Sequence, residues 1–187
     1  MSPGLVACFS GNMGSGKSSV SHVLAQALQW RRAGFGDYIR TRVREHGGNP
    51  NSREALQDLG QKLVESDPDG FCLAVLASGG FSPDEDLLLE GIRHVEIYRR
   101  VQRLVAPSRT VLIHLSVEEV EARRRIASRD GSNDDLERAR AHRVEADVQT
   151  SLPAIADLIV NAAPSVEAIA GEILRAIGSW RYSMEDE

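Results

Sequence analysis

Short apolar runs of strand type alternate along the chain with stretches in which apolar residues recur at helical spacing. The apolar runs predict strands over residues 4–9, 33–36, 86–93, 109–116 and 156–161. The helical spacing predicts helices over residues 19–28, 37–46, 53–65, 71–77, 95–105, 117–129, 136–148 and 166–177. The stretch 71–77 is short enough to fit a strand as well, and the C-terminal YSMEDE is expected to be frayed.

Strands joined by helices favour a parallel sheet with right-handed crossovers and helices on both faces. The sequence therefore predicts an α/β fold built on a five-stranded parallel sheet. In sheets of this kind, ligands bind at the carboxyl ends of the strands. Polar motifs that directly follow a strand are therefore the first candidates for a functional site.

Composition narrows the class of protein without changing this picture. The chain has 187 residues, 42% hydrophobic and 26% charged, which predicts one soluble globular domain over residues 1–187. Its net charge of −5 disfavours nucleic acid as a partner, although a local basic patch would escape this argument. Because no apolar run reaches the length of a membrane span, we expect a cytoplasmic protein without a membrane partner. Both a monomer and a homodimer fit the sequence.

Neither the cysteines nor the histidines show metal-binding spacing. Cys8 and Cys72 lie in apolar runs, where each is expected to be a small core residue. His114 alternates into a buried strand, which predicts a hydrogen-bonded core residue. His94 stands beside Arg93, where it could contact a substrate.

The segment SGNMGSGKSS, residues 10–19, lies between the first predicted strand and the first predicted helix, and Gly11 to Ser18 matches G-x-x-x-x-G-K-[ST]. Its small residues let successive N–H groups turn toward a phosphate chain, and the following helix adds a partial positive charge. Lys17 is expected to reach the β- and γ-phosphates, and the Ser18 hydroxyl is a ligand for Mg²⁺. A glycine turn that only connects strand to helix is the alternative. The expected ATP-binding residues are Asn12, Met13, Gly14, Ser15, Gly16, Lys17, Ser18 and Ser19.

The motif EGIR, residues 90–93, directly follows the apolar run of the third predicted strand. An acid at the tip of a buried strand beside a phosphate loop is placed to orient the Mg²⁺ water shell, so Glu90 is a candidate metal residue. Arg93 would face the same cleft and could hold an acceptor phosphate. The alternative is an ordinary strand end with a solvated arginine.

Asp37 follows the second predicted strand and starts a helix, which suits either an N-cap or a carboxylate near the acceptor hydroxyl or phosphate. The two roles are compatible. Arg40 lies one turn later on the same helix face, near enough to share a ligand with Asp37.

Arg125 and Arg129 are spaced i, i+4 at the end of the helix before the polar break DGSNDD, and Arg138 and Arg143 follow the break. Basic residues on both stems of such a segment could close over the transferring phosphates and neutralise their charge. The alternative is a solvated helix face on which the arginines pair with neighbouring glutamates.

These motifs resemble the P-loop nucleoside monophosphate kinase superfamily, which includes adenylate-kinase-like enzymes and dephospho-coenzyme A kinases, over nearly the whole chain. GNMGSGKS stands at the phosphate loop of that superfamily, EGIR at its acid-Gly-x-x-Arg turn, RIASR at its Arg-x-x-x-Arg lid stem and ADLIVNAAPSVEAI at its terminal strand and helix. FGDYIR is similar to the segment in which dephospho-coenzyme A kinases carry an aspartate near the acceptor hydroxyl. SREALQDLGQKL resembles a helix of phage-type deoxynucleoside monophosphate kinases.

The resemblance implies a three-layer P-loop kinase fold with a helical acceptor-binding region over residues 37–80 and a short lid over residues 125–143. It also implies roles for individual side chains. Those expected at the acceptor are Asp37, Arg40, Arg53, Gln57 and Arg93, and those expected to act in catalysis are Lys17, Asp37, Arg125 and Arg129.

The expected activity is a phosphotransferase that uses Mg²⁺ and moves the γ-phosphoryl group of ATP to a small phosphorylated acceptor, with a (deoxy)nucleoside monophosphate favoured. Dephospho-coenzyme A and a modified base in DNA are alternative acceptors. A P-loop ATPase or nucleotide switch that acts on a partner is the alternative from another functional class.

Overall fold

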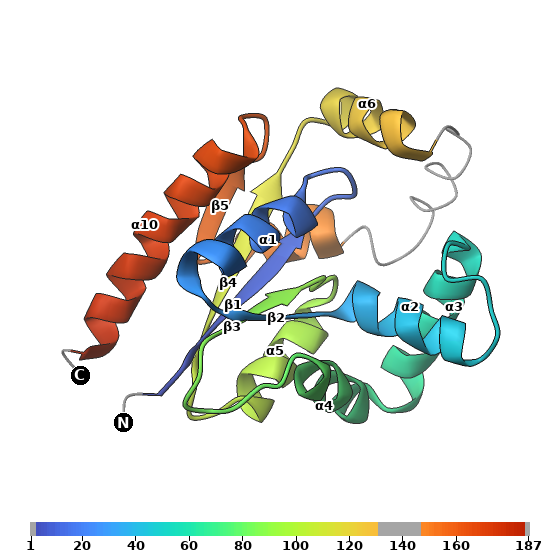
Figure 1. Cartoon of the computed structure of the whole chain (residues 1–187), viewed down its shortest axis with the longest axis horizontal. Helices are drawn as coiled ribbons and strands as arrows, with labels where there is room; N and C mark the ends of the chain where they lie inside the picture. The colour runs from blue at the N-terminus through green and yellow to red at the C-terminus, as the bar shows by residue number, and fades with distance from the viewer. Residues whose placement is uncertain (1–2, 131–146, 186–187) are drawn as a thin grey trace.

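Five parallel strands form the centre of the molecule (Figure 1). The computed structural model describes residues 3–130 and 147–185 of the chain. The strands lie in the order β2-β3-β1-β4-β5, and each neighbouring pair is parallel. They are β1 (Leu5–Gly11), β2 (Arg31–Gly34), β3 (Leu87–Glu90), β4 (Arg109–Ser116) and β5 (Leu158–Asn161). The predicted five-stranded parallel sheet is confirmed.

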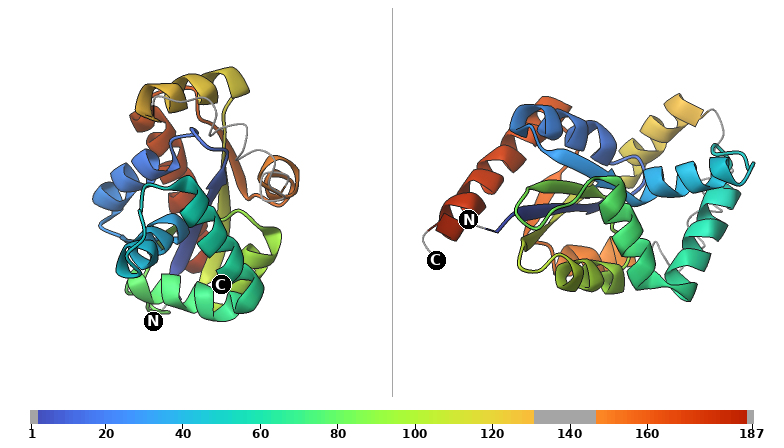
Figure 2. Two further views of the ribbon diagram at one scale, coloured as in Figure 1. Left: turned by 90° about the vertical axis from the view of Figure 1, so that its right-hand side faces the viewer. Right: turned by 60° about the horizontal axis from the view of Figure 1, so that its bottom comes forward.

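Helices connect the strands and cover both faces of the sheet (Figures 1 and 2). They are α1 (Lys17–Leu28), α2 (Phe35–Glu45), α3 (Arg53–Ser66), α4 (Pro68–Ser78), α5 (Val95–Leu104), α6 (Glu119–Asp130), α9 (Leu152–Ala154) and α10 (Val166–Glu185), with a π-helical turn η1 (Asp147–Ser151) before α9. Among the described helices, none is both long and apolar enough to cross a membrane. Most of the predicted helix 136–148 lies outside the described residues.

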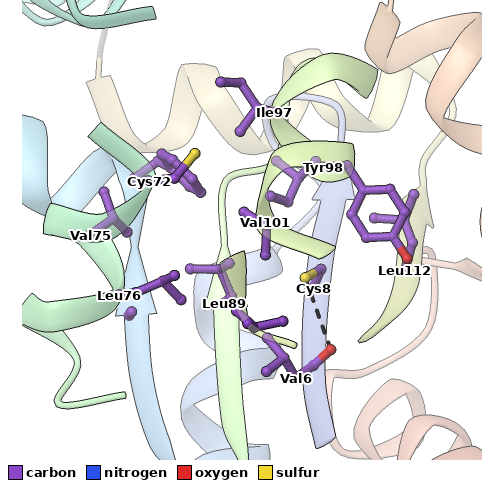
Figure 3. Packing of buried hydrophobic residues seen from close by; sticks show 14 of the residues in the cluster. Val6, Cys8, Cys72, Val75, Leu76, Leu89, Ile97, Tyr98, Val101 and Leu112 are labelled. Atoms are coloured by element: carbon purple, nitrogen blue, oxygen red, sulfur yellow. Dashed lines mark hydrogen bonds between the residues drawn. The ribbon is translucent and has the colours of Figure 1, made fainter. Parts of the chain in front are cut away.

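Alternate residues of β1 enter two hydrophobic cores, one on each face of the sheet. Val6 and Cys8 pack with residues of α4 and α5, as Figure 3 shows from close by. Leu5, Ala7 and Phe9 pack with residues of α1 and α10. All five are fully buried, because a parallel sheet with helices on both sides leaves neither face to solvent. Burial of both faces makes the sheet a rigid base for the loops at its edge.

The second strand lies earlier in the chain than the apolar pattern predicted. It spans Arg31–Gly34 and not 33–36, and Phe35 already belongs to α2. The prediction was wrong because this edge strand begins with two arginines that pair with glutamates. Phe35 is apolar for a different reason, since its ring packs edge-on against Phe71 with centroids 5.1 Å apart.

Asp37 consequently does not cap α2. The helix begins at Phe35 with Gly34 as its N-cap residue, and Asp37 lies within the first turn. The predicted N-cap role is therefore wrong. A carboxylate in the first turn still interacts favourably with the positive end of the helix, and it remains at the carboxyl edge of the sheet.

The helix predicted over 71–77 is confirmed, whereas the predicted end of the last helix is wrong. The stretch 71–77 is a helix, because α4 starts at Pro68 after the cap residue Asp67, whose side chain accepts a hydrogen bond from the Gly70 N–H. The last helix is longer than the predicted 166–177 and continues to Glu185. Its end is not frayed up to that residue, because Trp180 and Met184 pack against the core between α1 and α10.

The helices α2, α3 and α6 project from the end of the sheet toward which the strands point (Figures 1 and 2). The loop between β1 and α1 lies at the same end. The carboxyl ends of β1, β2 and β3 therefore face a space bordered by helices, as expected for the ligand side of a parallel α/β sheet.

His114 on β4 is a buried, hydrogen-bonded residue, as predicted. Its side chain is 3% exposed, and Nδ1 lies 2.9 Å from Ser10 Oγ on β1. Burial, aided by the positive charge of Lys17, lowers the pKa of His114 from 6.5 to about 4. Since the unfolded chain takes up this proton at higher pH than the folded chain, acidification favours unfolding.

We expect His114 to lower the free energy of unfolding as the pH falls from about 6.5 to about 4, by at most roughly 3 kcal/mol. A His114→Gln variant removes the titrating group and should show a flatter pH dependence in urea unfolding over this interval. His22→Gln, at an exposed position of α1, is the matched control and should keep the wild-type slope. Identical slopes for His114→Gln and the wild type would contradict the assignment.

Candidate active site

The loop between β1 and α1 has a backbone suited to surround a phosphate chain. Gly14 and Gly16 both have φ of 80°, in the left-handed region that glycine tolerates. Gly16 is the N-cap residue of α1, and no described side chain caps this helix. The first N–H groups of α1 are therefore available to an anionic ligand, which the field of the helix also favours.

The Lys17 ammonium lies against this loop. Its Nζ donates hydrogen bonds to the backbone oxygens of Gly11 at 2.7 Å and Asn12 at 2.8 Å, and to Ser15 Oγ at 3.2 Å. These bonds hold the ammonium beside the glycine backbone. When a phosphate binds there, Lys17 could donate to its charged oxygens in place of these neutral acceptors. Within the described part of the chain, Asn12 Oδ1 is the one fully buried side-chain oxygen or nitrogen without a hydrogen-bond partner.

Glu90 ends β3 and lies close to the phosphate loop. Among the described residues it is the one buried acidic side chain. Its carboxylate accepts hydrogen bonds from Ser21 Oγ on α1 and from the Arg32 guanidinium on β2. A buried carboxylate requires such partners, because an unpaired charge in the interior is very costly.

The donor set at this edge fits Mg²⁺. The Ser18 hydroxyl is exposed in the first turn of α1, and Glu90 borders the same cavity. Both offer the oxygen ligands that this hard cation prefers. In the described ranges, no group of three or more His, Cys, Asp or Glu residues is placed to hold a metal ion by itself.

A cavity of about 640 Å³ opens between the phosphate loop, α2, α3 and the end of β3. It brings together most of the residues that the sequence singled out. These are Met13, Gly14, Gly16, Lys17, Ser18, Ser19, Asp37, Arg40, Arg53, Gln57, Glu90, Arg93 and Arg125. Two expected ATP-binding residues, Asn12 and Ser15, belong to the loop but do not line the cavity.

Two contacts involve side chains of α2 and α3 that border this cavity. Arg40 Nη1 lies 2.9 Å from Asp37 Oδ1 in an exposed ion pair on α2, which agrees with the predicted pairing of these residues. Arg53 Nη1 lies 3.4 Å from Met13 Sδ, so α3 approaches the phosphate loop. The second contact brings together residues 40 positions apart in the sequence.

Arg125 fastens α6 to the loop that follows β5. Its Nε donates to Glu121 Oε1 at 2.7 Å, and its Nη1 and Nη2 donate to the backbone oxygens of Ala162 at 2.9 Å and Ala163 at 3.3 Å. This side chain therefore orients the stem of the predicted lid as well as bordering the cavity. Arg129 belongs to α6, but its side chain, like Arg138 and Arg143, lies outside the described residues.

Several residues that border the cavity were not predicted from the sequence as site residues. The apolar part of the cavity wall includes Phe35, Ile39, Leu56, Val64, Phe71 and Ile97. Each is an ordinary apolar position of a helix, so its sequence signal is indistinguishable from that of a core residue. Gln61 on α3 was missed too, although it follows Gln57 by one helical turn.

His94 also borders the cavity, next to Arg93. Its Nδ1 lies 3.7 Å from Asp147 Oδ2. Burial lowers the pKa of His94, although the nearby Asp147 carboxylate opposes this effect. The imidazole is therefore available at neutral pH as a neutral donor or acceptor at the cavity wall.

Neither cysteine is a candidate nucleophile. Both are buried, and burial raises the pKa of the Cys8 thiol well above its usual range and that of Cys72 to about 11. A thiol with a raised pKa supplies little thiolate at neutral pH. This agrees with the predicted role of both cysteines in the core.

Comparison with known proteins identifies the class. A family model described as an AAA domain (AAA_18) matches residues 8–146, and the chain belongs to this family. The site and fold place the protein in the P-loop nucleoside monophosphate kinase-like superfamily, as the motifs predicted. No curated protein matches the sequence.

Solved structures with the same fold include small-molecule kinases. A gluconokinase from Sinorhizobium meliloti 1021 matches with a TM-score of 0.59 and 20% identity, covering 98% of this chain and 96% of that one. A shikimate kinase from Acinetobacter baumannii in complex with shikimate matches with a TM-score of 0.60 and 16% identity, over 94% and 93%. A shikimate kinase from Bacteroides thetaiotaomicron matches with a TM-score of 0.57 and 16% identity, covering 93% of this chain and 98% of that one. At these identities the likeness shows the three-layer P-loop kinase fold.

Replacing Lys17 with Ala should lower turnover by roughly two orders of magnitude or more, because it removes the cation beside the phosphate loop. Calorimetric ATP binding should weaken while the circular dichroism spectrum stays unchanged. Lys62, the second of the two lysines in the chain, is exposed on α3 and provides the matched control. Near-normal turnover of Lys17→Ala, or an equal loss in Lys62→Ala, would contradict the assigned role.

Proposed function

We propose that the protein is an ATP- and Mg²⁺-dependent phosphotransferase whose acceptor is a (deoxy)nucleoside monophosphate. The observation that carries this proposal is a single cavity with a phosphate loop on one side and an acceptor wall, part apolar and part cationic, on the other. Because the donor is ATP, we also propose a cytoplasmic location.

The apolar part of the wall supports a flat, largely apolar moiety in the acceptor. Ile39, Leu56 and Phe71 would contact the faces of a nucleobase, and burial of such a ring contributes to affinity in proportion to its area. Gln57 and Gln61 carry amides that can both donate to and accept from the edge of a base. A polyhydroxylated acid would leave the aliphatic side chains without an apolar partner.

The cationic part of the wall supports a phosphate on the acceptor. Arg40, Arg53 and Arg93 border the cavity from three different elements of the fold. Guanidinium groups bind phosphate through paired, charge-assisted hydrogen bonds, which fix its orientation as well as its position. Arg93 follows β3 directly, so the rigid sheet determines its position.

Catalysis would consist of positioning and charge neutralisation. An oxygen of the acceptor phosphate attacks the γ-phosphorus, and the bond from this phosphorus to the β–γ bridging oxygen breaks as ADP leaves. Lys17 and the backbone N–H groups of the loop stabilise the charge on the phosphates. Mg²⁺, held by Ser18 and through water by Glu90, would supply further neutralisation. A phosphate acceptor at neutral pH carries mostly unprotonated oxygens, so no strong general base is needed.

Asp37 favours a second candidate function, the phosphorylation of a hydroxyl group. Its carboxylate is 69% exposed and borders the cavity, where it could accept the proton of an acceptor hydroxyl. Acceptors of this kind include dephospho-coenzyme A and a modified base in DNA. The ion pair with Arg40 supports the phosphate acceptor instead, because it gives Asp37 an orienting role.

A coupled assay of ADP release over a panel of acceptors tests the proposal. We expect release only with an added acceptor, fastest with one of the (deoxy)nucleoside monophosphates. Release with ATP alone at the same rate would indicate an ATPase or nucleotide switch. Fastest release with an acceptor hydroxyl, together with loss of at least roughly 100-fold in Asp37→Asn, would support the second candidate instead.

Arg93→Ala should raise the Michaelis constant for the acceptor strongly and that for ATP little. Loss of a bidentate, charge-assisted contact predicts a fall of roughly 30- to 1000-fold in kcat/KM for the acceptor. Arg93→Lys should restore only part of it, because an ammonium cannot reproduce the planar fork. Arg99→Ala, at an exposed position of α5 outside the cavity, is the control. Equal effects on ATP and acceptor would place Arg93 on the transferring phosphate, and no effect would remove it from the site.

A further inference from the structure

We propose that Arg32 is a positioning residue that holds Glu90 by one carboxylate oxygen and so presents the other oxygen to the cavity. The inference rests on the proposed function, because Glu90 would hydrogen-bond the water molecules around the Mg²⁺ that binds with ATP. Arg32 carries no sequence motif and does not border the cavity itself. Its role follows from its contacts.

The hydrogen bonds of Glu90 are all made by the same oxygen. Ser21 Oγ donates to Oε1, and Arg32 donates to Oε1 through both Nε, at 3.1 Å, and Nη2. In the described part of the chain, no residue donates to Oε2. Nor is Oε2 sealed from solvent, since the one fully buried side-chain oxygen or nitrogen without a partner there is Asn12 Oδ1. One oxygen is anchored and the other remains available.

The register of the sheet explains how Arg32 reaches this position. Gly34 of β2 stands opposite Glu90 of β3, and Arg32 precedes Gly34 on the same face of its strand. A long side chain can reach its diagonal neighbour across two strands. At Gly34 an added Cβ would lie 3.7 Å from Glu90 Cβ and 3.3 Å from Asp37 Oδ2. The glycine thus leaves the space between Asp37 and Glu90 open.

The contacts that anchor Glu90 are largely buried on the α1 side of the sheet. The side chain of Glu90 is 9% exposed and that of Arg32 is 28% exposed, while Ser21 is fully buried. Low exposure strengthens the ion pair and restricts rotation of the carboxylate. Ser21 follows Ser18 by one turn of α1, so the helix that supplies the expected Mg²⁺ ligand also anchors Glu90.

The neighbouring Arg31 of β2 forms an exposed ion pair outside the site. It pairs with Glu85 Oε2 at 3.0 Å, with both side chains more than half exposed, and it does not border the cavity. Exposed ion pairs of this kind contribute little to stability. Arg31 therefore provides a matched control in the same strand.

The test compares the affinity of ATP in EDTA with its affinity in saturating Mg²⁺, measured by calorimetry on the full chain. Partners that orient a metal-binding group typically change metal affinity 10- to 100-fold. We expect Glu90→Gln and Arg32→Gln each to reduce the enhancement by Mg²⁺ roughly tenfold. The enhancement is the ratio of the two ATP affinities of the same variant, so a change common to both conditions cancels. The double variant should lose no more than Glu90→Gln alone, Arg32→Lys should keep part of the enhancement, and Arg31→Gln should match the wild type.

Three results would overturn the proposal. An unchanged or larger Mg²⁺ enhancement in Arg32→Gln, with a loss in Glu90→Gln, would show that Arg32 does not position the carboxylate. Equal losses with and without Mg²⁺, accompanied by a lower melting temperature, would assign Arg32 a structural role only. Failure of the wild-type chain to bind ATP under either condition would overturn the proposed function together with this inference.

Discussion

The common direction of the five strands is the constraint on which the rest of the structure depends. In a parallel sheet all carboxyl ends meet at one edge, so the loop after β1, the start of α2 after β2 and the turn after β3 become neighbours. Helices on both faces bury β1 and the three leucines of β3 almost completely. A sheet covered in this way cannot shift without losing two cores, and it therefore holds the phosphate loop, Glu90 and Arg93 in a defined relation to each other.

The electrostatics of this edge differ from those of the whole chain. The protein carries a net charge of −5, yet the cavity is bordered by five basic side chains, namely Lys17, Arg40, Arg53, Arg93 and Arg125, against the two acids Asp37 and Glu90. A concave site lined by one sign of charge concentrates its field and attracts ligands of the opposite sign. The two acids are each paired with an arginine, which limits their repulsion of anionic ligands. The arrangement supports the proposal that the cavity binds two phosphorylated ligands.

The predicted fold agreed with the structure wherever one local signal dominated. Long apolar runs such as LLL at 87–89 identified the central strands, and the glycines and lysine of residues 11–18 identified the phosphate loop, because both depend on residues that are adjacent in sequence. Errors arose where a partner far along the chain decided the outcome. The edge strand β2 carries Arg31 and Arg32 because Glu85 and Glu90 face them, and α10 continues past 177 because Trp180 and Met184 find a core.

The same distinction applies to the site. The sequence by itself determined which chemical groups stand at the strand ends, since a phosphate-loop motif followed by a helix and an acid-Gly-x-x-Arg turn after a buried strand both have local causes. Only the tertiary structure decided which side chains cooperate. The anchoring of Glu90 by Arg32 and Ser21, separated from it by 58 and 69 positions, requires strands β2 and β3 in one register and α1 across them. Such pairings leave no periodic or adjacent pattern in a single sequence, because the contact is made by the packing of distant elements.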